Sequence, residues 1–324
     1  MKVAFLFTGQ GSQHSAMGRP FYDRYGEFRA ALDRCANYFG DHIDVSMKDL
    51  LLGDGHTELL EHTVYQQPAL FTLEYALAQL WISRGVTSDV LLGHSLGEIV
   101  AITVAECLEL SDAVALVANR ARLMQDCASR GSMLAAAAAV DRVLQVVSAL
   151  PAGRRERELA VAAINCPDRC VLAGTPELVV AAAELLRAAK IPSTALKVSH
   201  AFHSPLMTSA AHALGEFVST IRFRAPTTTV VSALGGTELR LAALENPQHW
   251  VRHCLDPVNF LAAVETVSGH GPHTFIEIGP SHTLLKFAQR CVPATAHRWL
   301  RSAAPTDVVC GEFEAGLAEV MMGV

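Results

Sequence analysis

Two spacings of apolar residues alternate along this chain. Short apolar runs, typical of buried strands, are separated by longer stretches in which apolar residues recur every three or four positions, as on one face of a helix. This alternation predicts an α/β fold in which helices cover a parallel sheet. We expect strands at residues 3–7, 90–92, 229–231 and 274–278, and helices at 67–81, 111–127, 259–267, 283–290 and 312–321.

The segment 131–197 has a different order of predicted elements. Its pattern reads strand, helix, strand, strand, helix, strand, which is the split βαβ or ferredoxin-like arrangement. We therefore predict a small ferredoxin-like subdomain at 131–197, inserted into a large α/β subdomain formed by 1–130 and 198–324. A cleft between them is a favoured place for a ligand. The charged run at 153–158 is expected to be a solvated loop.

Composition narrows the class of protein. With 324 residues, 51% of them hydrophobic, the chain has enough apolar residues for a large core. Its net charge of −6 gives no support for a nucleic acid or an anionic membrane as partner. No apolar stretch is long enough for a membrane span, and no signal peptide is evident. We expect a cytoplasmic protein whose eight scattered cysteines are reduced thiols, without a metal site.

The pentapeptide GHSLG at residues 93–97 follows an apolar run and precedes a helical pattern. That context is typical of a nucleophile elbow, in which a strand delivers a serine to a tight turn at the N-terminus of a helix. Loops at the carboxyl ends of parallel strands are also where open α/β folds place their sites. Ser95 is therefore a candidate nucleophile. The alternative is a glycine-serine turn without chemistry.

A nucleophilic serine needs a base, and fourteen histidines are available. Two of them, His200 and His203, lie on the segment that leaves the predicted small subdomain. Either could face Ser95 across the cleft. The residues alone do not choose between them.

Taken together, the motifs resemble a known family. The chain is similar to malonyl-CoA:acyl-carrier-protein transacylases, and more closely to the acyltransferase domains or discrete acyltransferases of polyketide synthases. The resemblance spans nearly the whole chain and implies an α/β-hydrolase-like core. The matching motifs are FTGQGSQ at 7–13, GHSLGE at 93–98, RARLMQ at 120–125, HAFH at 200–203, DPVNF at 256–260 and EIGP at 277–280.

The resemblance implies roles for individual residues. Ser95 matches the nucleophile that takes the acyl group, and His203 matches its base, so His200 becomes a neighbour. The backbone N–H groups of Gln10 and Leu96 match the oxyanion hole. The family's histidine is oriented by a main-chain carbonyl, and His253 occupies the matching position.

The resemblance also implies a substrate. Arg120 matches the arginine that binds the free carboxylate of malonyl groups, because a guanidinium pairs with a carboxylate through two hydrogen bonds. Phe202 and Leu96 match the residues found in family members that prefer malonyl over methylmalonyl. Expected partners are therefore malonyl-CoA, as substrate, and an acyl carrier protein, with no cofactor.

The expected setting is polyketide or fatty acid biosynthesis, and we expect a monomer acting in trans or a domain excised from a larger synthase. The alternative is an acyl hydrolase, which would remove acyl groups from carrier proteins with the same Ser-His dyad.

Overall fold

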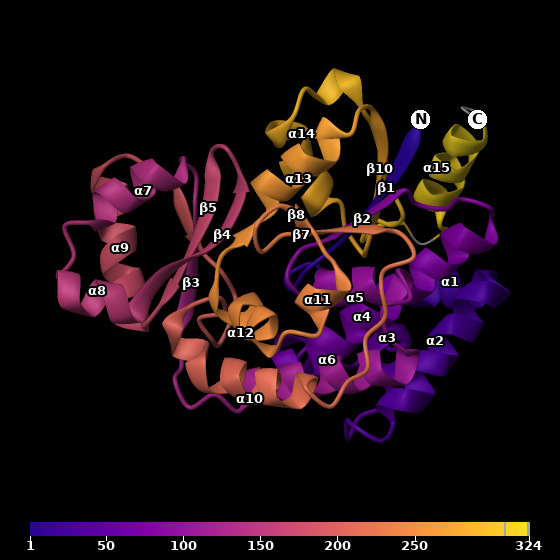
Figure 1. The fold of residues 1–324 in the computed structure, drawn as a ribbon, viewed down its shortest axis with the longest axis horizontal. Coiled ribbons are helices and arrows are strands. Elements are labelled where there is room, and N and C mark those ends of the chain that lie inside the picture. The colour runs from indigo at the N-terminus through magenta and orange to yellow at the C-terminus, as the bar shows by residue number, and fades with distance from the viewer. Residues whose placement is uncertain (308, 323–324) are drawn as a thin grey trace.

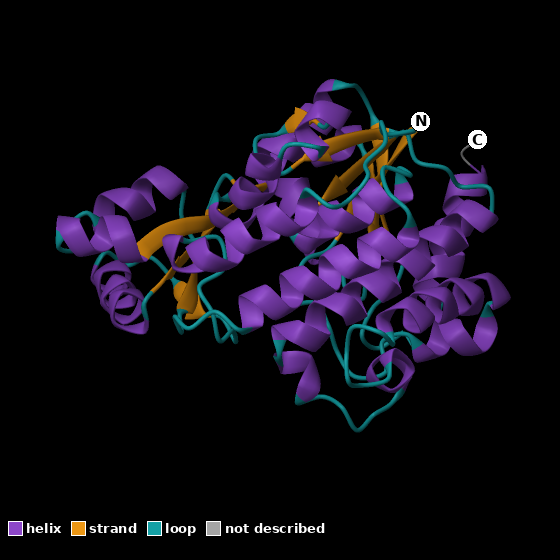
Figure 2. Cartoon of the chain, turned by 60° about the horizontal axis from the view of Figure 1, so that its bottom comes forward, coloured by secondary structure: helices purple, strands orange, loops and turns teal. Residues whose placement is uncertain are grey.

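The computed structural model describes residues 1–307 and 309–322. Its strands form two sheets that lie in separate parts of the molecule, as Figure 2 shows with the strands in orange. The larger sheet has the order β11-β10-β1-β2-β7-β8 and is parallel except for β8, which runs antiparallel to β7. Its strands are β1 (Lys2–Phe7), β2 (Val90–Gly93), β7 (Thr229–Ser232), β8 (Thr237–Glu238), β10 (His273–Ile278) and β11 (Arg298–Arg301).

The four strands expected in this sheet are confirmed, each to within one residue at either end. Their register brings the ends of several strands together: Phe7 of β1 pairs with Gly93 of β2, and Gly93 pairs with Ser232 of β7. The loops that follow these three strands therefore leave the sheet side by side. This is the edge at which an open α/β sheet places a site.

Helices cover the larger sheet, with α13 and α14 above it and α4, α5 and α6 below it in the view of Figure 1. The longest, α4, has 21 residues, and most of its side chains are buried. It starts four residues before the expected helix, at Thr63, ahead of the continuous apolar pattern. The helices are α1 (Arg19–Arg24), α2 (Gly26–Phe39), α3 (Met47–Leu52), α4 (Thr63–Ser83), α5 (Leu96–Val104), α6 (Leu110–Gln125), α7 (Val140–Val147), α8 (Ala152–Glu158), α9 (Pro176–Ala188), α10 (Thr208–Val218), α11 (Leu241–Leu244), α12 (Pro247–Leu255), α13 (Phe260–Gly269), α14 (Thr283–Cys291) and α15 (Gly311–Met322), with 3₁₀ turns at η1 (Leu59–Glu61), η2 (Pro205–Met207) and η3 (Ala294–Ala296).

The smaller sheet lies at the left of Figure 1 and has the order β6-β3-β5-β4-β9. Its first four strands follow the predicted order of elements, and a separate hydrophobic cluster packs them against α7 and α9. The fifth strand, β9, comes from far along the chain and pairs parallel with β4, which ties the smaller sheet to the rest of the molecule. The strands are β3 (Ser132–Ala136), β4 (Leu159–Cys166), β5 (Arg169–Gly174), β6 (Ser193–Ala195) and β9 (Val258–Asn259).

One expected loop is a helix. The whole charged run at 153–158 lies in α8, none of whose residues is buried. Its guanidinium and carboxylate groups pair along the helix, with Arg154 Nη2 2.8 Å from Glu158 Oε2 four residues on. Such pairs support an exposed helix that has no apolar face. The run is solvated, as expected, but the prediction of a loop was wrong.

None of the eight cysteines, all within the described residues, is in a disulfide. Among those residues there is also no cluster of side chains suited to hold a metal ion. No helix in the described part of the chain combines the length and apolar character needed to cross a bilayer.

Candidate active site

Ser95 sits on a strained turn between β2 and α5. Its backbone has φ 54° and ψ −109°, which a residue with a side chain rarely adopts. The turn lifts the side chain out of the strand direction and places it at the N-terminus of α5, where the first backbone N–H groups of a helix have no partner within it. This is the geometry of the expected nucleophile elbow.

The glycines on either side of Ser95 are required by close contacts. A Cβ atom at Gly93 would lie 2.0 Å from the backbone nitrogen of Glu98, and one at Gly97 would lie 2.3 Å from the carbonyl oxygen of Phe7. Both neighbours are backbone atoms, which cannot move aside without displacing the strand or the helix. The close packing of β1, β2 and α5 therefore requires both glycines of the G-x-S-x-G pattern.

His203 is the histidine that faces the nucleophile. Its Nε2 atom lies 2.8 Å from Ser95 Oγ, and its Nδ1 atom lies 3.0 Å from the carbonyl oxygen of Asp256. A carbonyl only accepts, so Nδ1 carries the proton and Nε2 is left with the lone pair that can accept the proton of Ser95. Its neighbour His200 is also buried but bonds to Ser199. The structure thus places at Ser95 the histidine that the family resemblance had implied.

The carbonyl that orients His203 belongs to Asp256, and the assignment to His253 was wrong. Helix α12 ends at Leu255, and Asp256 follows with extended backbone angles (φ −79°, ψ 158°) that turn its carbonyl out of the helix direction. His253 lies inside the last turn of α12, so its own carbonyl stays aligned with the helix. Its side chain instead reaches the interior of the site.

Burial is the main influence on His203. The side chain is 6% exposed, and desolvation, together with the nearby Arg120 guanidinium, holds its pKa well below the usual value for histidine. The hydrogen bond to Asp256 acts in the opposite direction but is weaker. The imidazole is therefore neutral at physiological pH, as a general base must be.

Arg120 reaches the nucleophile from α6. Its side chain is 1% exposed, and its Nη2 atom donates a hydrogen bond of 2.9 Å to Ser95 Oγ. Burial lowers its pKa, yet a guanidinium remains charged at neutral pH. No carboxylate of the described residues lies within salt-bridge distance of it, and its buried Nε has no hydrogen-bond partner among them. A buried cation in this state favours an anionic ligand.

Helix α4 holds Arg120 and the loop after β1 from behind. Gln67 accepts a hydrogen bond from Arg120 Nη1 and donates one of 2.7 Å to Thr63 Oγ1. The same Thr63 oxygen accepts a hydrogen bond of 2.9 Å from the side chain of Gln10, which also bonds to Gln66. These residues of α4 are spaced by three and four, so they share one face.

The two expected oxyanion donors flank the elbow. The hydrogen bonds at the start of α5 begin with Gly97 N–H to His94 O and Glu98 N–H to Ser95 O, so the preceding N–H of Leu96 is not used by the helix. The loop that carries Gln10 lies directly against the elbow, because a Cβ atom at Gly9 would be 2.8 Å from the carbonyl oxygen of His94. The segments that carry these two backbone amides therefore meet at the elbow.

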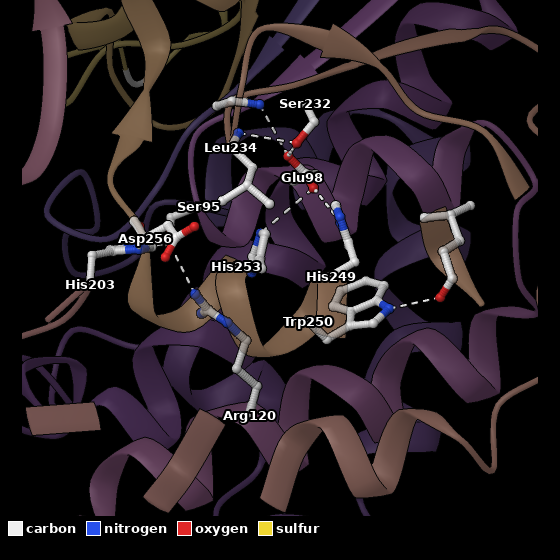
Figure 3. A network of polar contacts seen from close by, with 12 residues as sticks. Ser95, Glu98, Arg120, His203, Ser232, Leu234, His249, Trp250, His253 and Asp256 are labelled. Atoms are coloured by element: carbon white, nitrogen blue, oxygen red, sulfur yellow. Dashed lines mark hydrogen bonds and ion pairs between the residues drawn. The ribbon is translucent and has the colours of Figure 1, made fainter. Parts of the chain in front are cut away.

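Behind Ser95 lies a buried cluster that the sequence analysis missed (Figure 3). Glu98 Oε2 accepts hydrogen bonds from Ser232 Oγ (2.7 Å) and the N–H of Ala233 (3.2 Å), and Oε1 lies 3.3 Å from His249 Nε2 and 3.9 Å from His253 Nε2. Burial would raise the pKa of Glu98, but these partners together hold it below the usual value. Glu98 is thus a buried anion.

Next to this cluster is a small cavity of about 10 Å³, bordered by Ser95, His203 and His253. Burial lowers the pKa of His253 to about 4, so its ring is neutral. A space of this size has room for about one water molecule.

Phe202 is buried beside His203 and packs near His200, with ring centroids 6.1 Å apart. Its use as a specificity marker stays a prediction.

The elbow is also tied to the smaller sheet, because His94 Nε2 lies 3.0 Å from Asn165 Oδ1 of β4. Of the residues that the sequence analysis missed, Gln67 was visible as a polar residue at the start of an apolar helix, and Glu98 as part of the elbow motif.

A family model described as the acyl transferase domain matches residues 4–313. The chain belongs to this family. It is 38% identical, over 293 residues, to the spectinabilin polyketide synthase system protein NorB of Streptomyces orinoci. That match covers 90% of this chain but only 13% of NorB.

Solved structures of the family have the same fold. The acyltransferase domain from the second module of the salinomycin polyketide synthase superimposes with a TM-score of 0.90 at 32% identity, covering 99% of this chain and 73% of that one. The malonyl-CoA:acyl carrier protein transacylase of Xanthomonas oryzae pv. oryzae superimposes with a TM-score of 0.86 at 28% identity, covering 98% of this chain and 99% of that one. The family resemblance drawn from the motifs is confirmed.

Proposed function

We propose that this chain transfers a malonyl group from malonyl-CoA to the phosphopantetheine thiol of an acyl carrier protein, through a malonyl ester of Ser95. One observation carries the proposal: His203 Nε2 and Arg120 Nη2 converge on the same atom, Ser95 Oγ. A base beside the hydroxyl suits acyl transfer. A buried guanidinium at the same point suits an acyl group that ends in a carboxylate. The name of the Xanthomonas relative agrees with this substrate.

The proposed reaction begins when Ser95 Oγ attacks the thioester carbon and its proton passes to His203 Nε2. The oxyanion that forms accepts hydrogen bonds from the N–H groups of Leu96 and Gln10. When the carbon–sulfur bond breaks, coenzyme A leaves as a thiol with the proton from His203. The carrier's thiol then attacks the ester and gives its proton to His203, which returns it to Ser95.

Arg120 determines the substrate class in this scheme. Its Nη2 group would exchange the Ser95 hydroxyl for the malonyl carboxylate, so the acyl group's far end is held while its carbonyl faces the nucleophile. Phe202 and Leu96 are proposed to disfavour an α-methyl group. Crowding by one methyl is worth about 1 to 3 kcal/mol, so discrimination against methylmalonyl would be incomplete. The scheme requires no cofactor.

We also infer that the larger sheet is a hydrolase-like core, formed by 1–130 and 198–324, and that 131–197 is a ferredoxin-like insertion. The elbow after β2 supports the first inference. The order β6-β3-β5-β4 with antiparallel pairing supports the second.

The decisive experiment offers malonyl-, methylmalonyl- and acetyl-CoA together to the purified chain and reads the acyl adducts by intact-protein mass spectrometry. We expect a malonyl adduct that Ser95→Ala abolishes and that Ser219→Ala, at an exposed serine, retains. No adduct on the wild-type chain would contradict the proposal. Release of free malonate in place of loading when a carrier protein is added would instead favour the hydrolase.

Two variants of α6 test the assignment of malonyl as the substrate. Arg120→Ala should weaken malonyl loading and improve acceptance of acetyl-CoA relative to malonyl-CoA. Arg122→Ala changes an exposed arginine of the same helix and should leave the preference unchanged. If both variants keep the wild-type preference, Arg120 does not bind the carboxylate.

A further inference from the structure

A buried chain of hydrogen bonds connects helix α4 to the loop after β1. Thr8 Oγ1 is hydrogen-bonded to Glu74 Oε1 and lies 3.1 Å from Ser12 Oγ. Ser12 Oγ in turn donates a hydrogen bond of 3.1 Å to the carbonyl oxygen of Gly9. Thr8 is 2% exposed and Glu74 is fully buried, so water does not compete for the hydrogen bond between them.

The last acceptor in this chain belongs to a peptide group that matters for the proposed reaction. The carbonyl of Gly9 and the N–H of Gln10 are parts of one planar peptide unit, and in a trans peptide they point in opposite directions. Holding the Gly9 oxygen therefore sets the direction of the Gln10 N–H. A hydrogen bond accepted by the carbonyl also polarises the peptide, which makes its N–H a stronger donor.

We propose that Glu74, Thr8 and Ser12 are positioning residues, a relay that orients the Gly9–Gln10 peptide and so aims the Gln10 N–H at the oxyanion. This inference rests on the proposed function, in which that N–H is an oxyanion donor. None of the three side chains needs to touch the substrate. The relay differs from the side-chain anchors of Gln10 on Thr63 and Gln66, because it acts on the peptide plane itself.

The number of available protons supports the relay. Thr8 and Ser12 carry one proton each, and Ser12 gives its proton to Gly9. Thr8 donates to Glu74 when that carboxylate is ionised, and it donates to Ser12 when a protonated Glu74 donates to it. Burial, with the neighbouring Glu277 carboxyl adding to it, raises the pKa of Glu74 well above its usual value. Glu277 is itself buried, and desolvation raises its pKa to about 8. A protonated Glu74 lets each hydroxyl of the relay donate once.

The relay is tested first by single-turnover acylation from malonyl-CoA. We expect Ser12→Ala, Thr8→Val and Glu74→Leu each to slow acylation by about tenfold or more, because a misaimed oxyanion donor loses part of its effect. The malonyl-CoA concentration at half-maximal rate should stay the same. Combining Thr8→Val with Ser12→Ala should cost little more than the worse single change, since both break one chain.

Two variants separate positioning from general damage. Glu74→Gln keeps a donor and an acceptor, so it should acylate within about threefold of the wild-type rate. Thr72→Val removes another buried hydroxyl of α4, one that has no hydrogen-bond partner among the described residues, and should leave the rate unchanged. Wild-type rates in the Ser12, Thr8 and Glu74→Leu variants would overturn the proposal.

A second readout does not depend on activity. Gly9–Gln10 is the one Gly-Gln pair in the sequence, so labelling glycine carbonyls with ¹³C and glutamine amides with ¹⁵N gives a single NMR correlation for this peptide. Both shifts should move in Ser12→Ala and Glu74→Leu and stay in place in Thr72→Val. An unmoved correlation overturns the relay. If the wild-type chain forms no malonyl adduct while the correlation moves as expected, the proposed function fails and the positioning of the peptide stands.

Discussion

The elbow around Ser95 and the polar face of α4 serve the same site by different physical means. At the elbow, positions are set by backbone atoms in contact: Gly93 and Gly97 leave no room for a Cβ, and Ser95 has a strained backbone. On α4, positions are set by side-chain hydrogen bonds, from Thr63 and Gln67 to groups that lie beside the nucleophile. The first arrangement tolerates almost no change. The second can lose one contact and keep others.

This difference predicts how substitutions in the two regions affect the protein. A substitution at the elbow displaces a strand and a helix together, so stability and activity should both be lost. A change on α4 leaves the packing in place and alters the direction of Arg120 or Gln10, so activity should change with little loss of stability. Three substitutions test this contrast, and a pH profile tests the base that both regions serve.

The largest effect is expected for Gly93→Ala. Its Cβ would lie 2.0 Å from backbone atoms of α5, and we expect a loss of more than about 4 kcal/mol in unfolding free energy, or no folded protein. Thermal or denaturant unfolding measures it. Gly26→Ala is the control, because a Cβ there meets nothing within 4 Å. A stable Gly93→Ala protein would remove the contrast between the two regions.

Next comes Gln67→Met, which keeps the size of the side chain but removes its amide. Arg120 would lose the acceptor for Nη1, and we expect malonyl loading to fall about tenfold or more, from the lower end of the range for a hydrogen bond to a charged group upward. Acetyl loading should fall less. Competition between the two thioesters measures the ratio, and a melting temperature near that of the wild type shows that packing is kept. Equal losses of malonyl and acetyl loading would mean that Gln67 supports folding and does not position Arg120.

A smaller shift is expected in pH dependence. The pKa of His203 lies well below 6.5, so the base stays neutral and acylation should hold its plateau as pH falls through 6.5, declining only at lower pH. Desolvation is the main cause and Arg120 the next, so Arg120→Gln should move the decline toward higher pH. Acylation rates from pH 5 to 8 measure both curves. A decline centred at or above 6.5 in the wild type contradicts the buried, neutral base.

The smallest effect belongs to Thr63→Val. It removes one oxygen that both Gln10 and Gln67 use, yet Gln10 keeps Gln66 and Gln67 keeps Arg120. We expect acylation to slow by about threefold to tenfold, in line with one neutral hydrogen bond of about 1 kcal/mol. The single-turnover assay used for the relay measures this, with Thr72→Val as the matched control. If Thr63→Val also lowered the unfolding free energy by as much as Gly93→Ala, α4 would tolerate change no better than the elbow.

Local patterns determined much of this protein. The strands of the larger sheet follow from short apolar runs, because a strand buried on both faces needs apolar residues throughout. The elbow follows from residues adjacent in sequence, since the glycines and the serine make one turn. The motifs were also sufficient to indicate the family, which the comparisons confirm.

The tertiary structure decided what depends on distant residues. The folded chain shows the contact of His203 with Ser95 that the motif match had implied. Only the folded chain shows that Asp256, and not His253, orients His203, because this depends on where α12 ends and how the next residue turns. Gln67 and Glu98 stand out in the sequence, but their partners, and so their roles, depend on the folded chain for the same reason. The sequence alone does not show whether a buried polar residue caps a helix, holds another side chain or links two hydrogen bonds. Its partners in the folded structure decide this.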